Sequence, residues 1–321
     1  MQLLANQFGQ LQRTAFNTQY INKSAWIASN LSKKALLFLL LVEIIYINME
    51  NLREELIDKA KTLRVLPTLH SIIERLFVIL DDKNSSFSDL NDVIKYDQAV
   101  SSKIISIANS AYYSRGIEIF SLQRAMITMG FEEVKNIVMC LVFVENVLKE
   151  LKLRTDIILE LWKHSVFVAC AARTLAGRMF SEDPQKVFTI ALLHDIGKII
   201  FYITVENYNE LIAKVHSKGK SLNREEREIY GTDHEELGYI LSVKWQFPEE
   251  FSQIIRYHHD GKVAGKHESL LRLVRAADRF STASVHDSEP ETFILLKERD
   301  GIMKEVEKIM NIFQLNSHGT R

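Results

Sequence analysis

The sequence predicts an all-α protein with two lobes, in which an N-terminal helical bundle is followed by a second helical bundle. Glycine and proline number only 12 and 4 among the 321 residues, so the chain has few of the residues that interrupt helices. Apolar residues recur at the three- and four-residue spacing of one helix face, and strand-like alternation is nowhere sustained beyond a few residues.

Residues 1–48 are a leader of doubtful status. The apolar run 35–47 is shorter than the roughly 20 residues that cross a bilayer, and it contains Glu43 and follows Lys33 and Lys34. A signal peptide would begin with basic residues and end with small ones. An amphipathic helix opens at Met49, so we expect either that Met49 is the true start or that residues 1–48 are an appended segment. A membrane anchor is the alternative.

The N-terminal half, residues 49–150, is predicted to contain helices with apolar faces and no cluster of reactive side chains. Apolar positions 72, 73, 76, 77 and 80 follow the helical period, for example, and Gly130 separates two helices. The helices predicted in this half are residues 50–61, 72–80, 91–108, 121–130 and 132–148.

Residues 151–285 are predicted to form further helices, and these carry histidines. Asp183 and Pro184 are typical of an N-cap followed by the first helical position. Thr232 and Glu235 match a capping box, which places His234 in the first turn of its helix. The helices predicted here are residues 159–179, 185–201, one that opens at 232, 248–258 and 270–280. Residues 286–321 are predicted to add one or two helices, such as 291–313, without identifiable chemistry.

The two cysteines, Cys140 and Cys170, lie in apolar segments that are predicted to be helical. Two cysteines are too few for a disulfide framework. We therefore expect two buried free thiols in the reducing environment of the cytoplasm.

The charge balance argues against a nucleic-acid binder. Lysine and arginine number 40, aspartate and glutamate 41, and the net charge is −1, which is unlike the strongly basic footprint of such proteins. Lys266, Arg272, Arg275 and Arg279 form a modest basic face that a solvated helix explains equally well. Arg275 also lies one turn before Asp278 and could orient its carboxylate.

Seven residues of the second half have side chains that bind metals, and each lies on or beside a predicted helix. They are His164, His194, Asp195, His234, His258, His259 and Asp278. A helical bundle can bring side chains from several helices to one interior point. Imidazole and carboxylate together suit zinc, iron, manganese or nickel, and an aspartate beside a histidine could bridge two ions.

Among these residues, the pair His194-Asp195 gives the strongest indication of a metal site. A single histidine on a helix is more often a hydrogen-bonded structural residue than a ligand. This pair, however, stands between the apolar runs 190–193 and 196–200, where an ionised carboxylate costs free energy unless it has a cationic partner or a metal. Lys198 is four residues after His194 and is either a solvated lysine or a group that reaches a phosphate oxygen.

Residues 192–198, Leu-Leu-His-Asp-Ile-Gly-Lys, resemble the signature of the HD superfamily of metal-dependent phosphohydrolases. The pattern of that superfamily is a histidine, a His-Asp pair and a later aspartate, and it maps onto His164, His194, Asp195 and Asp278. The further histidines of binuclear members map onto His234, His258 and His259. Lys198 matches the lysine that faces the substrate phosphate in such proteins.

Other motifs resemble the HDOD domain, which is related to the HD-GYP domains. They stand in the family's order at 66–69, 94–113, 121–130, 162–165 and 231–238, within a region of about residues 60–285. Gln98 replaces a proline that the family often has. The resemblance implies a bacterial signalling or regulatory module, and although many members have lost HD ligands, this sequence keeps the full set. His259 is not followed by the Glu and Gly-Tyr-Pro of the cyclic-dinucleotide phosphodiesterase branch.

Two hypotheses follow. The one favoured by the resemblance is a non-catalytic module that holds one or two divalent transition metal ions and acts through a protein partner. The alternative is a phosphohydrolase acting on a nucleotide or cyclic dinucleotide, in which the metals activate water and Lys198 stabilises the phosphoryl group. A phosphorylated small molecule could bind in either case, whereas nucleic acid and membrane are not expected partners.

Overall fold

The computed structural model describes residues 33–63, 75–79, 82, 84–94, 98–110, 112–114, 116, 118–141, 153–179, 182–259, 267–282 and 289–312, with side chains from residue 46 onward. Of these residues 81% are helical and none is in a strand, which confirms the all-α prediction. The chain divides into two compact units, residues 1–52 and 53–321. The domain boundaries predicted near residues 150 and 285 lie outside the described residues.

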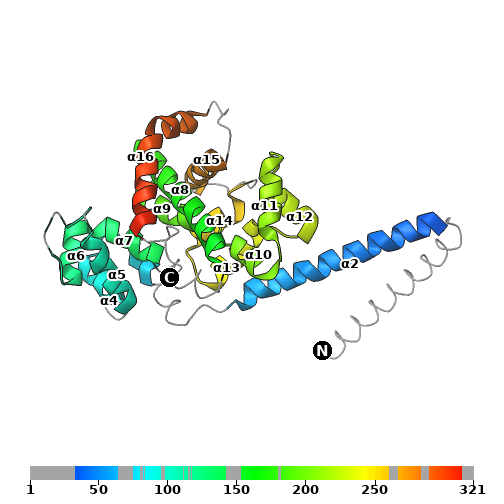
Figure 1. The fold of residues 1–321 in the computed structure, drawn as a ribbon, viewed down its shortest axis with the longest axis horizontal. Helices are drawn as coiled ribbons and strands as arrows, with labels where there is room; N and C mark the ends of the chain where they lie inside the picture. Colours follow the sequence, from blue (N-terminus) through cyan, green and yellow to red (C-terminus); the bar gives the residue numbers. More distant parts are fainter. Residues whose placement is uncertain are drawn as a thin grey trace, which may run out of the picture. The chain divides into compact units, whose positions relative to one another are not determined.

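The helices keep the labels of Figure 1. In chain order they are α2 (Lys33–Thr62), α4 (Phe87–Ile94), α5 (Gln98–Ala108), α6 (Leu122–Met129), α7 (Phe131–Leu141), α8 (Thr155–Met179), α9 (Pro184–Leu193), α10 (Lys198–Thr204), α11 (Tyr208–Ser217), α12 (Leu222–Tyr230), α13 (His234–Lys244), α14 (Glu249–Tyr257), α15 (Glu268–Thr282) and α16 (Pro290–Ile312).

The prediction that a helix opens at Met49 is wrong, because α2 runs through this residue without a break. No glycine or proline occurs in α2 to interrupt it. The apolar run 35–47 belongs to the same helix, and the part of the leader before residue 33 lies outside the described residues. Residues 53–62 belong to the second unit, where Leu56 and Ala60 are fully buried.

In the N-terminal half, the single helix predicted for residues 91–108 is two helices. Helix α4 begins earlier because Ser86 and Asp89 cap it reciprocally: the Ser86 hydroxyl and backbone N–H both donate to the Asp89 carboxylate. At its end, the Ile94 carbonyl accepts from the Ser101 hydroxyl (2.9 Å). The prediction for 121–130 is confirmed, since Ser121 caps α6 and Gly130 ends it. Residues 142–148 of the last predicted helix, like the 66–69 motif, lie outside the described residues.

Helix α8 is the centre of the second half and packs against α9, α15 and α16 (Figure 1). Its Trp162 is fully buried together with Phe188 of α9 and Phe201 of α10. Asp183 caps α9 and accepts from the backbone N–H of Gln185 (2.8 Å), with Pro184 at the first position as predicted. The helix predicted for 159–179 begins four residues earlier than expected.

Among the described residues, one stretch, residues 184–204, is long and apolar enough to cross a membrane by composition. Its side chains are 78% buried within the fold, and a turn at residues 194–197 divides it into α9 and α10. It is therefore part of the core of the helical domain. Cys140 and Cys170 are both buried and unbonded, as predicted.

Candidate metal centre

His194 and Asp195 lie in a turn between α9 and α10, and the single helix predicted for residues 185–201 is therefore wrong. Helix α9 ends at Leu193 and α10 begins at Lys198. The turn lies directly on α13, because Gly197 has no Cβ to hold the two backbones apart. The packing thus brings the His194-Asp195 pair to the first residue of α13, which is His234.

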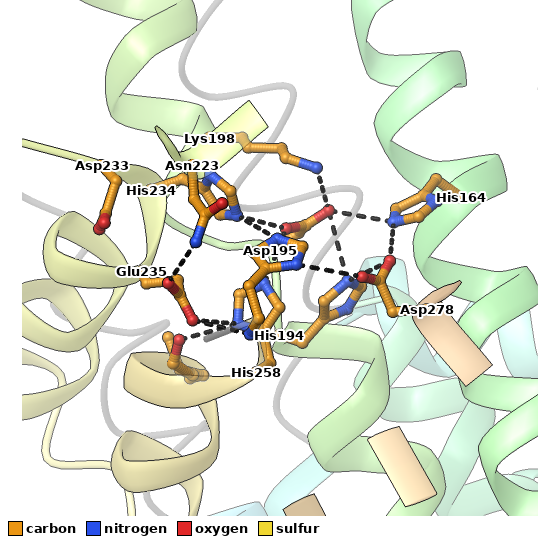
Figure 2. A network of polar contacts seen from close by, with 12 residues as sticks. His164, His194, Asp195, Lys198, Asn223, Asp233, His234, Glu235, His258 and Asp278 are labelled. Atoms are coloured by element: carbon orange, nitrogen blue, oxygen red, sulfur yellow. Dashed lines mark hydrogen bonds and ion pairs between the residues drawn. The ribbon is translucent and has the colours of Figure 1, made fainter. Parts of the chain in front are cut away.

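The other histidines and Asp278 come from the ends or interiors of three further helices. His164 lies in α8 and Asp278 in α15. His258 ends α14 and His259 follows it, as predicted. Figure 2 shows that His164, His258 and Asp278 converge on the His194-Asp195 pair, and His259 contacts His234, so the structure brings together all seven residues that the sequence singled out.

The N-cap of α13 is Asp233 and not Thr232 as predicted. The Asp233 carboxylate accepts from the backbone N–H of Glu236 (2.7 Å), whereas the Thr232 hydroxyl donates to the Glu236 side chain (2.9 Å). The capping box is shifted by one residue, because aspartate is at least as good an N-cap as threonine. His234 is the first helical residue, in the first turn as expected.

The two carboxylate oxygens of Asp195 face two different pairs of histidines. Oδ2 lies 3.1 Å from His164 Nε2 and 3.4 Å from His194 Nε2. Oδ1 lies 3.5 Å from the Nε2 atoms of both His234 and His258. Asp195 is therefore placed between two groups of donors, in the position of a bridging carboxylate (Figure 2).

Asp278 and His259 complete the two groups. Asp278 Oδ1 lies 3.3 Å from His164 Nε2 and 3.6 Å from His194 Nε2. His259 Nε2 lies 2.9 Å from His234 Nε2, and its Nδ1 lies 3.5 Å from Asp278 Oδ2. We call His164, His194, Asp278 and Oδ2 of Asp195 the first subsite. We call His234, His258, His259 and Oδ1 of Asp195 the second subsite. The donor atoms of these four residues lie close enough together to share one ion, and so do those of His164, His194 and Asp195 in the first subsite.

The spacing of these atoms suits a cation between them. Two ligands about 2.1 Å from one tetrahedral ion are about 3.4 Å apart, and the contacts between Asp195 and the four histidines range from 3.1 to 3.5 Å. Several of the converging atoms are buried and have no hydrogen-bond partner in the described structure: Nε2 of His164, His194 and His258, and Oδ1 of Asp195. Such atoms cost free energy unless something binds them.

In His194 and His258, the hydrogen bond of the outer ring nitrogen, which is the Nδ1 atom facing away from Asp195, shows that Nε2 is free to bind a metal. His194 Nδ1 lies 2.7 Å from the carbonyl oxygen of Ala191, and His258 Nδ1 lies 2.9 Å from that of Ile255. Because a carbonyl only accepts, both Nδ1 atoms must donate. In the neutral ring, Nε2 then carries a lone pair directed at Asp195, which is the tautomer that metal-bound histidine needs.

The electrostatics of the centre favour ionised carboxylates. Burial raises the pKa of Asp195, but the charges of His194 and Lys198 outweigh burial and hold this pKa well below its usual value. Burial likewise opposes ionisation of Asp278, but the imidazoles of His164 and His194 beside it outweigh burial and hold its pKa well below the usual value. Burial lowers the pKa of His194, whereas Asp195 and Asp278 outweigh it and raise this pKa to about 10. The centre thus attracts positive charge, as a proton or as a metal ion.

Lys198 is tied into the centre and is not a solvated surface lysine. Its ammonium group pairs with Oδ2 of Asp195 (Figure 2), and its side chain is only 13% exposed. The side chains of His164 and His259 are also partly exposed, by 22% and 25%. The side chains of His194, His234 and His258 are fully buried.

Sequence reasoning missed two buried glutamates behind the second subsite. Glu226 Oε2 faces His234 Nδ1 at 2.6 Å. Glu235 accepts from the backbone N–H of His259 (2.8 Å) and from Asn223 (3.0 Å). Glu226 stands next to the partly exposed Glu225 in α12, and the two are chemically identical, so only the fold distinguishes the one that turns inward.

The basic residues of α15 are engaged within the protein. Arg272 pairs with Glu291 and Arg279 with Glu289. Arg275 donates to the carbonyls of Tyr257 and His258 (2.7 and 3.1 Å), so it supports the backbone at the end of α14. Lys266 lies outside the described residues. These pairs agree with a solvated helix face more than with a surface for nucleic acid.

Comparison with known proteins gives one family and a set of similar folds. A family model described as the HDOD domain matches residues 66–261. An HDOD domain protein of unknown function from Geobacter sulfurreducens is 22% identical, with a TM-score of 0.66 over 82% of this chain and 97% of its own. A protein from Shewanella amazonensis SB2B, provisionally named a metal-dependent phosphohydrolase, is 21% identical, with a TM-score of 0.50 over 83% and 99%.

Two further relatives are longer than the matched region. A protein from Marinobacter aquaeolei VT8, provisionally named a signal transduction protein, is 18% identical with a TM-score of 0.66 over 83% of this chain and 65% of its own. An uncharacterized protein from Treponema pallidum (strain Nichols) is 21% identical over 61% of this chain. The matched region spans only 38% of that curated relative. At these identities the solved structures support the fold and not a shared activity.

Proposed function

The chain belongs to the HDOD family, and we propose that it is a bacterial signalling module whose HD site holds one or two divalent transition metal ions. The observation that supports this proposal most strongly is the position of the Asp195 carboxylate. Its Oδ2 faces His164 and His194, while its Oδ1 faces His234 and His258. A bridging carboxylate between two sets of imidazoles is the arrangement expected of a two-metal centre. The provisional name of the Marinobacter relative, a signal transduction protein, agrees with it.

Each subsite would take one ion. When bound, the ions would supply positive charge that attracts a phosphorylated small molecule or nucleotide and would lower the pKa of a bound water. The protein's own part is to present Nε2 of the buried histidines through the carbonyls that hold their Nδ1 atoms. Imidazole and carboxylate donors suit zinc, iron, manganese and nickel alike.

A signalling role requires that the state of the centre reach a protein partner. Helix α8 carries His164 and packs against α9, α15 and α16, so a change at His164 acts on the central helix of this half. The N-terminal half adjoins the second through Phe77, whose ring lies 4.7 Å from that of Phe247 and 4.8 Å from that of Phe251. We propose that these contacts transmit ligand binding to a partner-binding surface.

The second candidate function is phosphoester hydrolysis of a nucleotide or cyclic dinucleotide. The observation that favours it is the partial exposure of Lys198, His164 and His259 in an otherwise buried centre. A phosphoryl group that entered there would meet the Lys198 ammonium, which can donate to a phosphoryl oxygen as negative charge develops. Burial lowers the pKa of Lys198, but Asp195 and Asp278 outweigh burial and raise this pKa, so the group stays protonated.

Elemental analysis of the purified full chain tests both candidates. We expect one to two transition metal ions per chain, lost in His194→Ala and Asp195→Ala and kept in the control His267→Ala, because His267 faces Glu250 instead of the centre. Wild-type protein without metal, after loading with manganese or zinc, would refute the proposed centre. Metal-dependent hydrolysis of bis(p-nitrophenyl) phosphate or a nucleotide, abolished in the two variants, would favour the phosphohydrolase; metal without turnover would favour the signalling module.

A further inference from the structure

The two subsites differ in the negative charge of their own ligands. The first subsite has the carboxylate of Asp278 in addition to one oxygen of Asp195. The second subsite has three imidazoles and only the other oxygen of Asp195. Because ligand charge contributes to the affinity for a divalent ion, negative charge supplied from outside the second subsite would strengthen its binding of an ion.

Glu226 of α12 lies directly behind the second subsite. Its side chain is fully buried, and its Oε2 faces His234 Nδ1 at 2.6 Å and accepts from the backbone N–H of His234 at 2.9 Å. Within the part of the chain that the structure describes, no lysine or arginine forms an ion pair with it. A buried carboxylate is costly without positive charge close by, and the His234 ring is the group in direct contact with Glu226 that can carry such charge.

Among the described residues, the other histidines of the centre have no carboxylate as near to the outer ring nitrogen: the nearest are Asp278 Oδ2, 3.5 Å from His259 Nδ1, and Glu235 Oε1, 3.9 Å from His258 Nδ1. His194 and His258 have backbone carbonyls there, and His164 Nδ1 lies 3.3 Å from the Ser281 hydroxyl. A carboxylate partner holds a histidine in the tautomer with Nδ1 protonated and makes its Nε2 a stronger donor than a carbonyl partner does.

The far oxygen of Glu226 is also held. The Tyr208 hydroxyl donates to Oε1, and the Tyr208 ring is buried and stacks on Phe201 of α10, with centroids 4.8 Å apart and planes 11° from parallel. Glu226 is therefore fixed between a buried phenol and the imidazole, which keeps its carboxylate aimed at His234.

We propose that Glu226 is a positioning residue that orients His234 and supplies the negative charge that the second subsite lacks, so that the affinity of the second ion depends on it. This inference rests on the proposed metal centre. It assigns the two ions different determinants: Asp278 for the first and the Tyr208–Glu226 pair, acting through His234, for the second.

The test is manganese binding to the full chain, measured by calorimetry and by electron paramagnetic resonance. We expect wild type to bind two ions with the spectrum of a coupled pair. Glu226→Gln keeps the size of the side chain and removes its charge, so we expect the second ion to bind about 10- to 100-fold more weakly and the spectrum of a single uncoupled ion to appear. Glu226→Asp, which restores the charge, should recover part of the coupled signal.

Glu225→Gln is the matched control, because Glu225 is the adjacent glutamate and pairs with Lys220 at the surface; it should bind both ions like wild type. Circular dichroism of the metal-free proteins checks that the variants fold. If Glu226→Gln does not fold, Tyr208→Phe provides the test instead. Loss of the Tyr208 hydroxyl should weaken binding of the second ion severalfold. Wild type that binds no metal refutes the proposed function and this inference together. Wild type with two ions and folded variants that bind the second ion equally tightly refute this inference alone.

Discussion

The backbone of Gly197 lies so close to His234 that a Cβ on Gly197 would stand 1.9 Å from the His234 carbonyl oxygen and 2.5 Å from the backbone nitrogen of Gly238. These neighbours are backbone atoms and cannot rotate away as a side chain could. The contact sets the distance between the turn that holds Asp195 and the helix that begins with His234. The lack of a side chain at Gly197 thus allows Asp195 and His234 to lie close enough to belong to one centre.

Gly197→Ala should therefore destabilise the fold and loosen the centre. We expect the free energy of unfolding to fall by about 3 kcal/mol or more, because the added methyl group forces two backbones apart. Gly177→Ala in α8 is the control: only one side-chain atom, 4.0 Å away, would meet its Cβ, so we expect a gain of about 0.5–1 kcal/mol. Urea denaturation measures both, and equal stabilities would contradict the close contact.

Asp195→Asn and Asp278→Asn should remove different amounts of metal. Asp195 has one oxygen on each subsite, so its amide variant should weaken both ions. Asp278 Oδ1 lies beside His164 and His194, so its variant should mainly weaken the first ion. Metal content after exhaustive dialysis distinguishes them. The assignment of subsites would be wrong if Asp278→Asn lost both ions as completely as Asp195→Asn.

Lys198→Met should separate anion binding from metal binding. The lysine side chain is 13% exposed and pairs with Asp195, but neither subsite uses it as a ligand. We expect the variant to keep its metal and to bind inorganic phosphate about tenfold more weakly, since a buried charge-assisted hydrogen bond is worth roughly 1.5–3 kcal/mol. Isothermal titration with phosphate provides the measurement. Lys163→Met, which changes an exposed lysine of α8, should behave like wild type.

Glu133 should make stability depend on pH on the acid side. Burial raises the pKa of Glu133, but hydrogen bonds from Lys308 (2.6 Å) and Tyr113 outweigh burial and lower this pKa below its usual value. Because the pKa is lower in the folded state, the stabilisation is complete above the unfolded pKa of about 4.3. It is lost as the pH falls from there through the folded pKa.

Glu133→Gln should accordingly lower stability at pH 7 and flatten its decline between about pH 5 and the folded pKa. Chemical denaturation at several pH values checks this. Glu118→Gln is the control, because Glu118 is exposed, and surface substitutions usually change stability by less than about 0.5 kcal/mol. Parallel pH profiles for wild type and Glu133→Gln would contradict the role of the Lys308 contact, which joins α16 to α7.

Local patterns were enough to predict the helical class and the residues of the candidate centre. The helical period depends on spacing within one segment, and the cost of burying Asp195 among apolar neighbours is visible in seven consecutive residues. Capping residues such as Asp183 and Ser121 marked helix starts in the same way. Where prediction failed locally, as in the helix break at residues 194–197, the cause was non-local: the turn packs on α13, far along the chain.

The arrangement of the centre needed the packed fold. His164 and Asp278 are 114 positions apart in the sequence, and their 3.3 Å contact depends on how α8 and α15 pack. No local pattern distinguishes the buried Glu226 from the partly exposed Glu225 next to it. A sequence carries the chemistry of each side chain and the period of each helix, whereas distances and burial arise only when helix faces meet.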